Sequence, residues 1–407
     1  MRVLWLLLSL VVTLPPADTD WPQWGGRSRD FVVAAAAPAP WPDSGPSVLW
    51  RRPIGDGYSS IVAVGGRLFT LERTGDEEAV VALDAATGAT IWATKYAAPF
   101  EARYVLEQGP GPRATPLVAD GVVVATGASG WLHALDAATG RVLWQINLIA
   151  EQGGTIKVRG YACSPLLWKH LAIVQVGGDG QALVAFDLRT GKIAWKGGTF
   201  KNSYASPILI DVDGQPQIVA LTFGEVSGFD PDSGRLLWSH PHPTQDGVAV
   251  STPVWDRDGH LLFVSSSYGG GSRVIEIRAA NGTSTVTEKW AHQRVRIHHG
   301  NALIVDGAVI AASGDTGVAP LSAVDLKTGE MLWRDRSIDS ASLLRIGNRV
   351  LALTDEGRLA LVEVTRAGVT TLAQTTVLTS TSWTPPSVAG DVIYLRNRKE
   401  IVALKLR

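Results

Sequence analysis

A repeated turn motif constrains the fold of this chain more than any other feature. The motif is Asp, two variable residues, Thr or Ser, Gly and, four residues later, Trp. Full copies begin at Asp84, Asp136, Asp187, Asp230 and Asp325, and a degraded copy keeps only Asn281-Gly282 and Trp290. Asp and Thr side chains can close a turn by bonding to the backbone, while Gly takes a positive φ. Each copy therefore predicts a β-hairpin, and its aspartate is interpreted as a turn former, not as an acid or a metal ligand.

The spacing of the tryptophans predicts a β-propeller. Counted from Trp50, they follow at intervals of 42, 52, 51, 43, 52 and 43 residues, at positions 92, 144, 195, 238, 290 and 333. Propeller blades of four strands have periods of about 40 to 50 residues. Thr-Pro or Ser-Pro pairs recur upstream of the hairpins, and proline is tolerated there because the first residue of a strand needs no ladder bond.

The two ends of the chain are expected to share the last blade. After Trp333 one full unit follows, with its tryptophan replaced by Leu372, and residues 385–407 then supply only three strands. Residues 47–53 form a strand without inner partners, so they can complete that blade. We therefore predict an all-β fold, an eight-bladed propeller with four-stranded antiparallel blades, closed by the N-terminal strand so that no long edge stays unpaired. Deleting residues 19–53 should prevent folding, although we expect it to remove almost no core volume.

Composition excludes several classes of protein. The chain of 407 residues has 37 Lys and Arg against 38 Asp and Glu, and no block of like charges. The long-range attraction that drives nucleic-acid or anionic-membrane binding is therefore missing. A hydrophobic fraction of 45% with 15 tryptophans excludes a disordered chain. Cys163 is the one cysteine, so no internal disulfide can form.

The N-terminus predicts export. An apolar run from Val3 to Leu14 follows Arg2, as in a signal peptide, and it is too short for a bilayer span of about 20 residues. We expect a signal peptide at residues 1–17, an N-terminal extension and linker at residues 18–46, and the propeller at residues 47–407. No cysteine follows the apolar run, so no lipid anchor is expected. The predicted location is the periplasm or the outside of the cell.

Residues 21 to 407 resemble a known family. The repeated turn, together with Trp21-Pro22-Gln23-Trp24, is similar to the exported pyrroloquinoline-quinone-like propeller repeat proteins. This family includes quinoprotein alcohol dehydrogenases and an outer-membrane protein assembly lipoprotein, which is a cofactor-free scaffold. In the dehydrogenases, the resemblance implies a quinone between a tryptophan floor and two adjacent disulfide-bonded cysteines, with Ca²⁺ held by carboxylate and amide. Cys163 stands alone, which argues against that branch, and the missing lipidated cysteine is a departure from the other.

Aligning the repeats identifies one mouth of the channel. The residue three before each Ser/Thr-Pro proline (counted from the second proline, Pro386, in the last blade), or at the equivalent place, leads into an innermost strand. These positions are Tyr58, Arg113, Ala162, Tyr204, Val250, His299, Ser340 and Trp383. They vary from blade to blade toward residues that anchor interfaces. Tyr58, Arg113, Tyr204, His299 and Trp383 are therefore the candidate ligand- or partner-binding residues. The other interpretation is that they plug the channel and contribute only to structure.

No catalytic or metal-binding residues are predicted. His298-His299 invites a metal assignment, but neighbours on a strand point to opposite faces and no third ligand lies at a suitable spacing. The preferred function is an exported, non-catalytic binding or assembly scaffold whose channel mouth holds a protein or peptide partner, with no cofactor. The alternatives are a pyrroloquinoline-quinone-dependent dehydrogenase with calcium and a propeller that binds a small ligand or carbohydrate.

Overall fold

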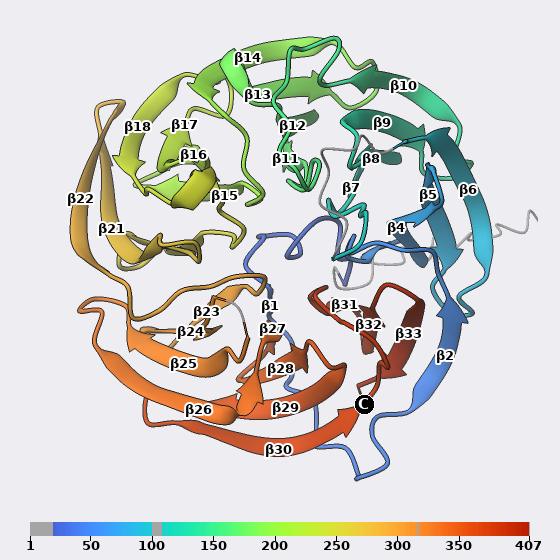
Figure 1. Cartoon of the computed structure of the whole chain (residues 1–407), viewed down its shortest axis with the longest axis vertical. Coiled ribbons are helices and arrows are strands. Elements are labelled where there is room, and N and C mark those ends of the chain that lie inside the picture. Colours follow the sequence, from blue (N-terminus) through green and yellow to red (C-terminus); the bar gives the residue numbers. More distant parts are fainter. Residues whose placement is uncertain (1–18, 100–107, 316, 407) are drawn as a thin grey trace, which may run out of the picture.

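The chain folds into a closed ring of eight antiparallel sheets, as the sequence predicted (Figure 1). The computed structural model describes residues 19–99, 108–315 and 317–406. The predicted signal peptide at residues 1–17 lies outside the described residues. Over those ranges no helix is long and apolar enough to cross a bilayer.

Each blade runs from an innermost strand at the channel to an outermost strand at the rim. Blade 1 contains β3 (Val62–Val64), β4 (Arg67–Thr74), β5 (Glu77–Asp84) and β6 (Thr90–Ala97), and blade 2 contains β7 (Leu117–Ala119), β8 (Val122–Thr126), β9 (Trp131–Asp136) and β10 (Val142–Asn147). Blade 3 contains β11 (Leu166–Trp168), β12 (Leu171–Gln175), β13 (Gly178–Asp187) and β14 (Ile193–Phe200), and blade 4 contains β15 (Ile208–Val212), β16 (Gln215–Leu221), β17 (Glu225–Phe229) and β18 (Leu236–Pro241). Blade 5 follows the short helix η1 (Gln245–Gly247) and contains β19 (Val254–Asp256), β20 (Leu261–Ser266), β21 (Gly271–Ala280) and β22 (Thr283–His292). Blade 6 contains β23 (Ala302–Val305), β24 (Ala308–Ala312), β25 (Pro320–Asp325) and β26 (Met331–Asp339), and blade 7 contains β27 (Ala341–Ile346), β28 (Arg349–Thr354), β29 (Arg358–Val364) and β30 (Val369–Thr376).

Blade 8 combines the two ends of the chain. Its inner strands are β31 (Ser387–Ala389), β32 (Val392–Arg396) and β33 (Glu400–Lys405), and β2 (Val48–Pro53) pairs with β33 as the outermost strand. Figure 1 shows β2, in blue, beside β33, in red. The predicted closure of the ring is therefore confirmed.

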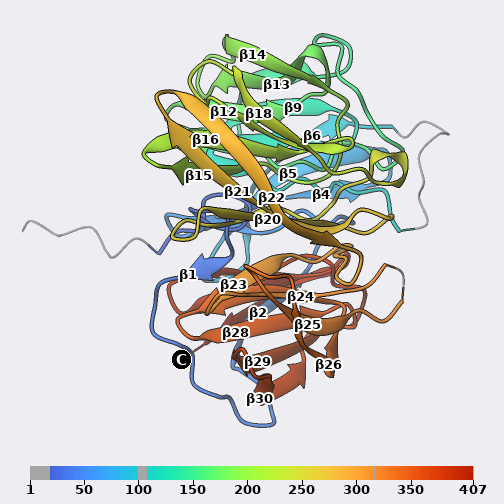
Figure 2. The same cartoon turned by 90° about the vertical axis from the view of Figure 1, so that its left-hand side faces the viewer.

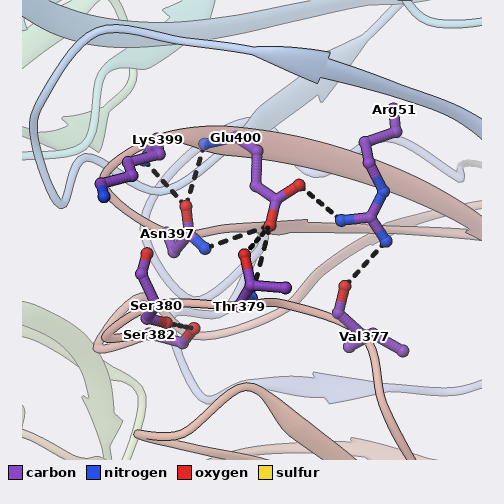
Figure 3. Close-up of polar contacts among 8 residues, drawn as sticks. All are labelled: Arg51, Val377, Thr379, Ser380, Ser382, Asn397, Lys399 and Glu400. Atoms are coloured by element: carbon purple, nitrogen blue, oxygen red, sulfur yellow. Dashed lines mark hydrogen bonds and ion pairs between the residues drawn. The ribbon is translucent and has the colours of Figure 1, made fainter.

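A polar network holds this closure in place (Figure 3). The Arg51 guanidinium on β2 donates to the Glu400 carboxylate at 2.5 Å and to the Val377 carbonyl at 2.9 Å. The other Glu400 oxygen accepts from the Thr379 hydroxyl and from the Asn397 amide. Although its partial burial opposes this, the hydrogen bond from Arg51 lowers the pKa of Glu400. The network ties β2 both to its own blade and to the connector that arrives from blade 7.

The predicted hairpin turns are confirmed, and they contact the neighbouring blade. At the first copy the Asp84 carboxylate accepts from the Thr87 amide and hydroxyl, and Gly88 has a φ of 71°. A Cβ on Gly88 would lie 2.7 Å from the Trp50 ring of blade 8. Six of the seven repeat tryptophans also donate their indole N–H to a turn carbonyl of the next blade, the donors being Trp50, Trp92, Trp144, Trp195, Trp290 and Trp333. The turn motif and the tryptophan therefore act together as the contact between successive blades.

Two positions depart from this rule. Blade 5 has a two-residue turn at Asn281-Gly282, both with positive φ, and Trp238 of blade 4 donates instead to Gln217 of its own blade at 2.6 Å. In blade 7 the sequence interpretation was wrong by one residue. Leu361 pairs with Ala373 as Ala82 pairs with Trp92, and Leu372 lies at the bulge. Ala373, and not Leu372, therefore occupies the tryptophan position of blade 7.

The N-terminal extension packs on the ring. It crosses the centre of the view in Figure 1, and β1 (Val32–Val33) pairs in parallel with β27 as a fifth strand of blade 7. Trp21 and Phe31 are 4% and 3% exposed within the hydrophobic core. Figure 2 shows the chain running on from β1 along blade 7 before it reaches β2. Removal of residues 19–53 would therefore remove core side chains, which the sequence analysis did not expect.

Candidate functional site

The repeat alignment correctly grouped residues at one end of the channel. We call this end the connector mouth, because the connectors between blades enter the innermost strands there. A hollow of about 860 Å³, counted out to its opening, lies at this mouth. Seven of the eight aligned residues line it: Tyr58, Arg113, Ala162, Tyr204, Val250, His299 and Trp383. Ser340, the eighth, lines an adjoining hollow. All five candidate binding residues therefore line one cavity.

The Ser/Thr-Pro pairs set the position of these residues. The Ser60 amide donates to the Thr115 hydroxyl of the next blade at 2.9 Å, and the Thr115 amide donates to Ser164 at 2.9 Å. The Ser164 amide continues the series to Ser206 at 3.0 Å. These buried bonds join successive connectors just before the inner strands begin. The repeated hydroxyl is therefore structural, which leaves the variable position nearby free to differ between blades.

Aromatic rings form a continuous stack along one wall of the cavity. The Tyr58 and Trp383 ring centroids are 5.2 Å apart with an interplanar angle of 18°, and His299 lies 4.2 Å beyond Trp383 at 13°. The His298 ring contacts His299 at 3.6 Å, and Tyr268 donates to or accepts from His298 at 2.6 Å. Burial lowers the pKa of His299 to about 3 and also lowers the pKa of His298. Both imidazoles are therefore neutral near pH 7.

The two histidines are arranged differently from the sequence expectation. They lie in a connector and not in a strand, and their rings face each other instead of pointing to opposite sides. Within residues 19–99, 108–315 and 317–406, no three His, Cys, Asp or Glu side chains are grouped closely enough to hold a metal ion. The pair contributes aromatic surface to the stack.

Two guanidinium groups form the cationic side of the cavity. Arg113 donates to the Arg159 carbonyl at 2.9 Å and to the Gly109 carbonyl at 2.7 Å, and its guanidinium lies 5.8 Å from the Tyr58 ring centre. Arg159 donates to the Gln108 side chain, and the Arg159 amide donates to the Tyr204 hydroxyl at 3.3 Å. Burial lowers the pKa of Arg113, and the nearby Arg159 adds to this. Neither guanidinium has a carboxylate partner among the described residues, so the cavity can accept an anionic group.

The floor of the cavity comes from the N-terminal extension. Trp24 lines the cavity and donates its indole N–H to the Thr252 hydroxyl at 2.9 Å. Arg29 is 2% exposed and donates to the Pro165 carbonyl at 2.8 Å and to Ser164 at 3.3 Å. Trp21 forms an antiparallel bridge with Ala63 near the opposite mouth of the channel. The extension therefore fills the channel from one end and leaves the connector mouth hollow.

Sequence reasoning missed several lining residues. Trp24 belongs to the motif that carried the family resemblance, but its place in the channel depends on how the extension folds back. Arg159 and Tyr268 lie outside the aligned position, in a connector and in the tip of a hairpin, so the repeat phase did not select them. Arg159 could have been found from the sequence, because it lies only three residues before Ala162, which is one of the aligned positions.

The adjoining hollow is acidic. It lies beyond Trp383 and His299 and is lined by Asp315, Asp355 and Ser340. Asp315 forms an ion pair of 2.7 Å with Arg296. Burial raises the pKa of Asp355 to about 6. The connector mouth is therefore cationic on the side of blades 2 to 4 and acidic on the side of blades 6 and 7.

The residues of the cavity do not fit a quinone held by calcium. Calcium takes six to eight oxygen ligands, chiefly carboxylates and carbonyls, and no carboxylate is among the described residues that line the cavity. Cys163 is buried, and its sulfur lies within hydrogen-bond distance of Gln175 and Asn202. Burial raises the pKa of this thiol well above its usual range. The thiol is therefore a structural group beneath the cavity.

Comparison with known proteins gives two kinds of relative. A family model described as outer membrane protein assembly factor BamB matches residues 30–160 and 76–335. The Burkholderia pseudomallei protein named outer membrane protein assembly factor BamB is 25% identical over 348 residues, which cover 76% of this chain and 86% of that protein. The dehydrogenase subunit of a quinone alcohol dehydrogenase from Acetobacter aceti is 33% identical over 258 residues, which cover 53% of this chain and 33% of that protein.

The alignments differ in how much of each relative they include. The matched region spans about a third of the length of the alcohol dehydrogenase relatives. The structure of quinohemoprotein alcohol dehydrogenase from Comamonas testosteroni superposes with a TM-score of 0.65 at 14% identity, covering 95% of this chain and 80% of that one. This superposition shows a shared fold.

Proposed function

We propose that this chain, which belongs to the family described as outer membrane protein assembly factor BamB, is an exported binding scaffold that holds a segment of a protein partner at the connector mouth. It is not an enzyme in this proposal. The observation that carries the proposal is the convergence, in one open cavity, of an aromatic stack and two guanidinium groups that have no carboxylate partner within the described part of the chain. Aromatic and arginine side chains in a pocket are the residues that dominate binding energy at interfaces.

The construction of the cavity supports recognition of a partner. Tyr58 is 8% exposed, and its hydroxyl donates to the Gln108 carbonyl at 2.6 Å. Tyr204 is 7% exposed, and its hydroxyl accepts from the Arg159 amide at 3.3 Å. Rings that are fixed before binding lose little conformational entropy when a partner docks. Their burial also means that the cavity has a structural role, so each variant must be tested for folding as well as for binding.

The proposal can be tested by photocrosslinking at the mouth. Benzoylphenylalanine placed at Ser340, on the rim, should crosslink a periplasmic protein that mass spectrometry can identify. The same group at exposed Asp232, in the turn of blade 4 on the opposite face, serves as the control. Adding Arg113→Ala and Trp383→Ala to the Ser340 probe should remove the crosslink while the circular dichroism spectrum stays native. Equal crosslinking from both faces, or a crosslink that survives both substitutions, would refute the proposal.

A quinone-dependent dehydrogenase is the second candidate. The sequence similarity to the Acetobacter aceti dehydrogenase subunit favours it, whereas the lining of the cavity does not fit the cofactor. Incubation of the purified protein with pyrroloquinoline quinone and Ca²⁺, followed by gel filtration and an absorbance spectrum, separates the two functions. The scaffold predicts that no quinone coelutes, and stoichiometric retention would assign the dehydrogenase.

A further inference from the structure

We propose that a platform beside the cavity, made by Phe223, Lys157 and Lys201, binds an acidic segment of the partner through one apolar anchor flanked by carboxylates. This inference rests on the proposed function of the connector mouth and names the chemistry of the partner. Phe223 is at the tip of the β16–β17 hairpin and is 42% exposed. The Lys157 ammonium lies 4.6 Å, and the Lys201 ammonium 5.7 Å, from the centre of its ring.

The phenylalanine ring is held in place. A Cβ on Gly247 would lie 2.1 Å from the ring, so the ring packs against the backbone of the β18–β19 connector. Lys157 crosses to the same connector, where its ammonium donates to the Asp246 carbonyl, and the Phe223 amide donates to the Lys201 carbonyl at 3.4 Å. An exposed aromatic residue that is already ordered is a good interface anchor because docking costs it little side-chain entropy.

The platform has an excess of positive charge. Neither Lys157 nor Lys201 has a carboxylate within ion-pair distance among the described residues, and Asp246 is the acidic residue whose field reaches Lys157. Partial burial lowers the pKa of Lys157, and Lys201 lowers it further. Two ammonium groups therefore lie beside one exposed aromatic ring, where carboxylates of a partner would relieve their repulsion.

The platform continues into the cavity. Lys157 is followed by Val158, which is 48% exposed, and by Arg159, which lines the cavity. An extended segment that places an apolar side chain over Phe223 would therefore lead its next residues toward two guanidinium groups. An anionic membrane surface is a poorer fit, because Asp355, which has no ion-pair partner among the described residues, opens on the same mouth and would oppose flat docking.

Fluorescence anisotropy with full-length protein and a labelled peptide of alternating Asp and Leu around one central Phe tests this proposal. We expect saturable binding that weakens as salt rises, because exposed charges are screened. Phe223→Ser, and separately Lys157→Glu with Lys201→Glu, should each weaken binding by about tenfold or more. The matched control reverses two exposed lysines on the opposite face, Lys192→Glu with Lys327→Glu, and should leave affinity unchanged.

Three outcomes would overturn the proposal. In the first, the protein binds a peptide with Asn in place of Asp as tightly as the Asp peptide. In the second, both platform variants keep the affinity of the native protein. In the third, the protein does not bind the peptide but sediments with phosphatidylglycerol vesicles in a way that depends on the platform. The platform variants keep the cavity residues, and the Arg113→Ala with Trp383→Ala variant keeps the platform. If only the cavity variant loses the crosslink, the proposed function stands and the platform is refuted. If the peptide binds but no crosslink is specific to the mouth, the platform stands and the proposed function is refuted.

Discussion

The contact between blades makes a quantitative prediction at Trp144. Its ring lies on the outermost strand of blade 2, and its indole N–H donates to the Leu188 carbonyl of blade 3 at 2.9 Å. The ring stacks on Phe186 at 5.8 Å with an interplanar angle of 27°, and it covers Gly191. Trp144→Ala should therefore remove a stacking contact, one hydrogen bond and the cover over the next turn.

The expected cost is about 3 kcal/mol. Truncating a core tryptophan costs about 3 to 5 kcal/mol, and Trp144 is only partly buried, which lowers this value. The lost hydrogen bond adds about 1 kcal/mol. Urea unfolding followed by far-ultraviolet circular dichroism measures the change. A cost below about 1 kcal/mol would refute the argument that the repeated tryptophans hold the blades together.

A double-mutant cycle with Gly191 gives a sharper test. Gly191→Ala should destabilise in two ways, because φ is 68° and the new Cβ would lie 2.7 Å from the Trp144 ring. Gly121→Ala is the matched control: φ is 74°, and apart from its chain neighbours no described residue lies within 4 Å of the place of the new Cβ. It should cost only the backbone strain, about 1 to 2 kcal/mol. In the Trp144→Ala background, Gly191→Ala should lower the free energy of unfolding by only about as much as the control substitution does. If Gly191→Ala destabilises this background as much as it destabilises the native protein, the ring and the turn are independent.

Three further predictions concern closure and pH. Deletion of residues 19–33 should destabilise the protein but leave a folded ring. Deletion of residues 19–53 should leave no soluble folded protein, because it also removes β2. The yield of soluble protein and its circular dichroism spectrum compare the two deletions. Glu400→Gln should lower the free energy of unfolding by about 1 kcal/mol. If the ion pair with Arg51 at 2.5 Å is the source, this loss should vanish in an Arg51→Ala background. Urea unfolding of the native protein, the two single variants and the double variant measures it. The pKa of Asp355 is raised from 3.8 to about 6 by burial, so its stabilising contribution is present at low pH and is lost as pH rises through 6. The melting temperature of Asp355→Asn relative to the native protein should therefore be higher at pH 7 than at pH 4.

The fold could be predicted because its determinants are local and repeated. The Asp84 turn, for example, is formed within five residues by the Asp, Thr and Gly of the motif, so the sequence alone specifies it. The closing strand was predictable from counting, because residues 47–53 were left without partners. Position 373 was not, because the bulge that distinguishes Leu372 from Ala373 depends on pairing with β29, which no local pattern reports.

The residues of the site could be predicted only where they occupy the same position in successive sequence repeats. Tyr58, Arg113, Tyr204, His299 and Trp383 occupy equivalent places in their blades, so finding one locates the others. Trp24 has no equivalent in any blade. Its place depends on a hydrogen bond to Thr252, which lies 228 residues away. Contacts of this range come from the folding of the whole ring and leave no periodic signal in the sequence.

The cavity is built from both ends of the chain, and this connects ring closure with binding. Trp24 supplies the floor from the N-terminal extension, while Trp383 enters the stack from the connector that follows β30. That connector is fixed by Glu400, which also holds Arg51 of the closing strand. A chain whose last blade is open would therefore lose the hydrogen bond from Arg51 to the Val377 carbonyl of this connector as well as the sealed edge. If the connector mouth is the binding face, partner capture should weaken when β2 is removed, because Arg51 then no longer supports the connector that carries Trp383.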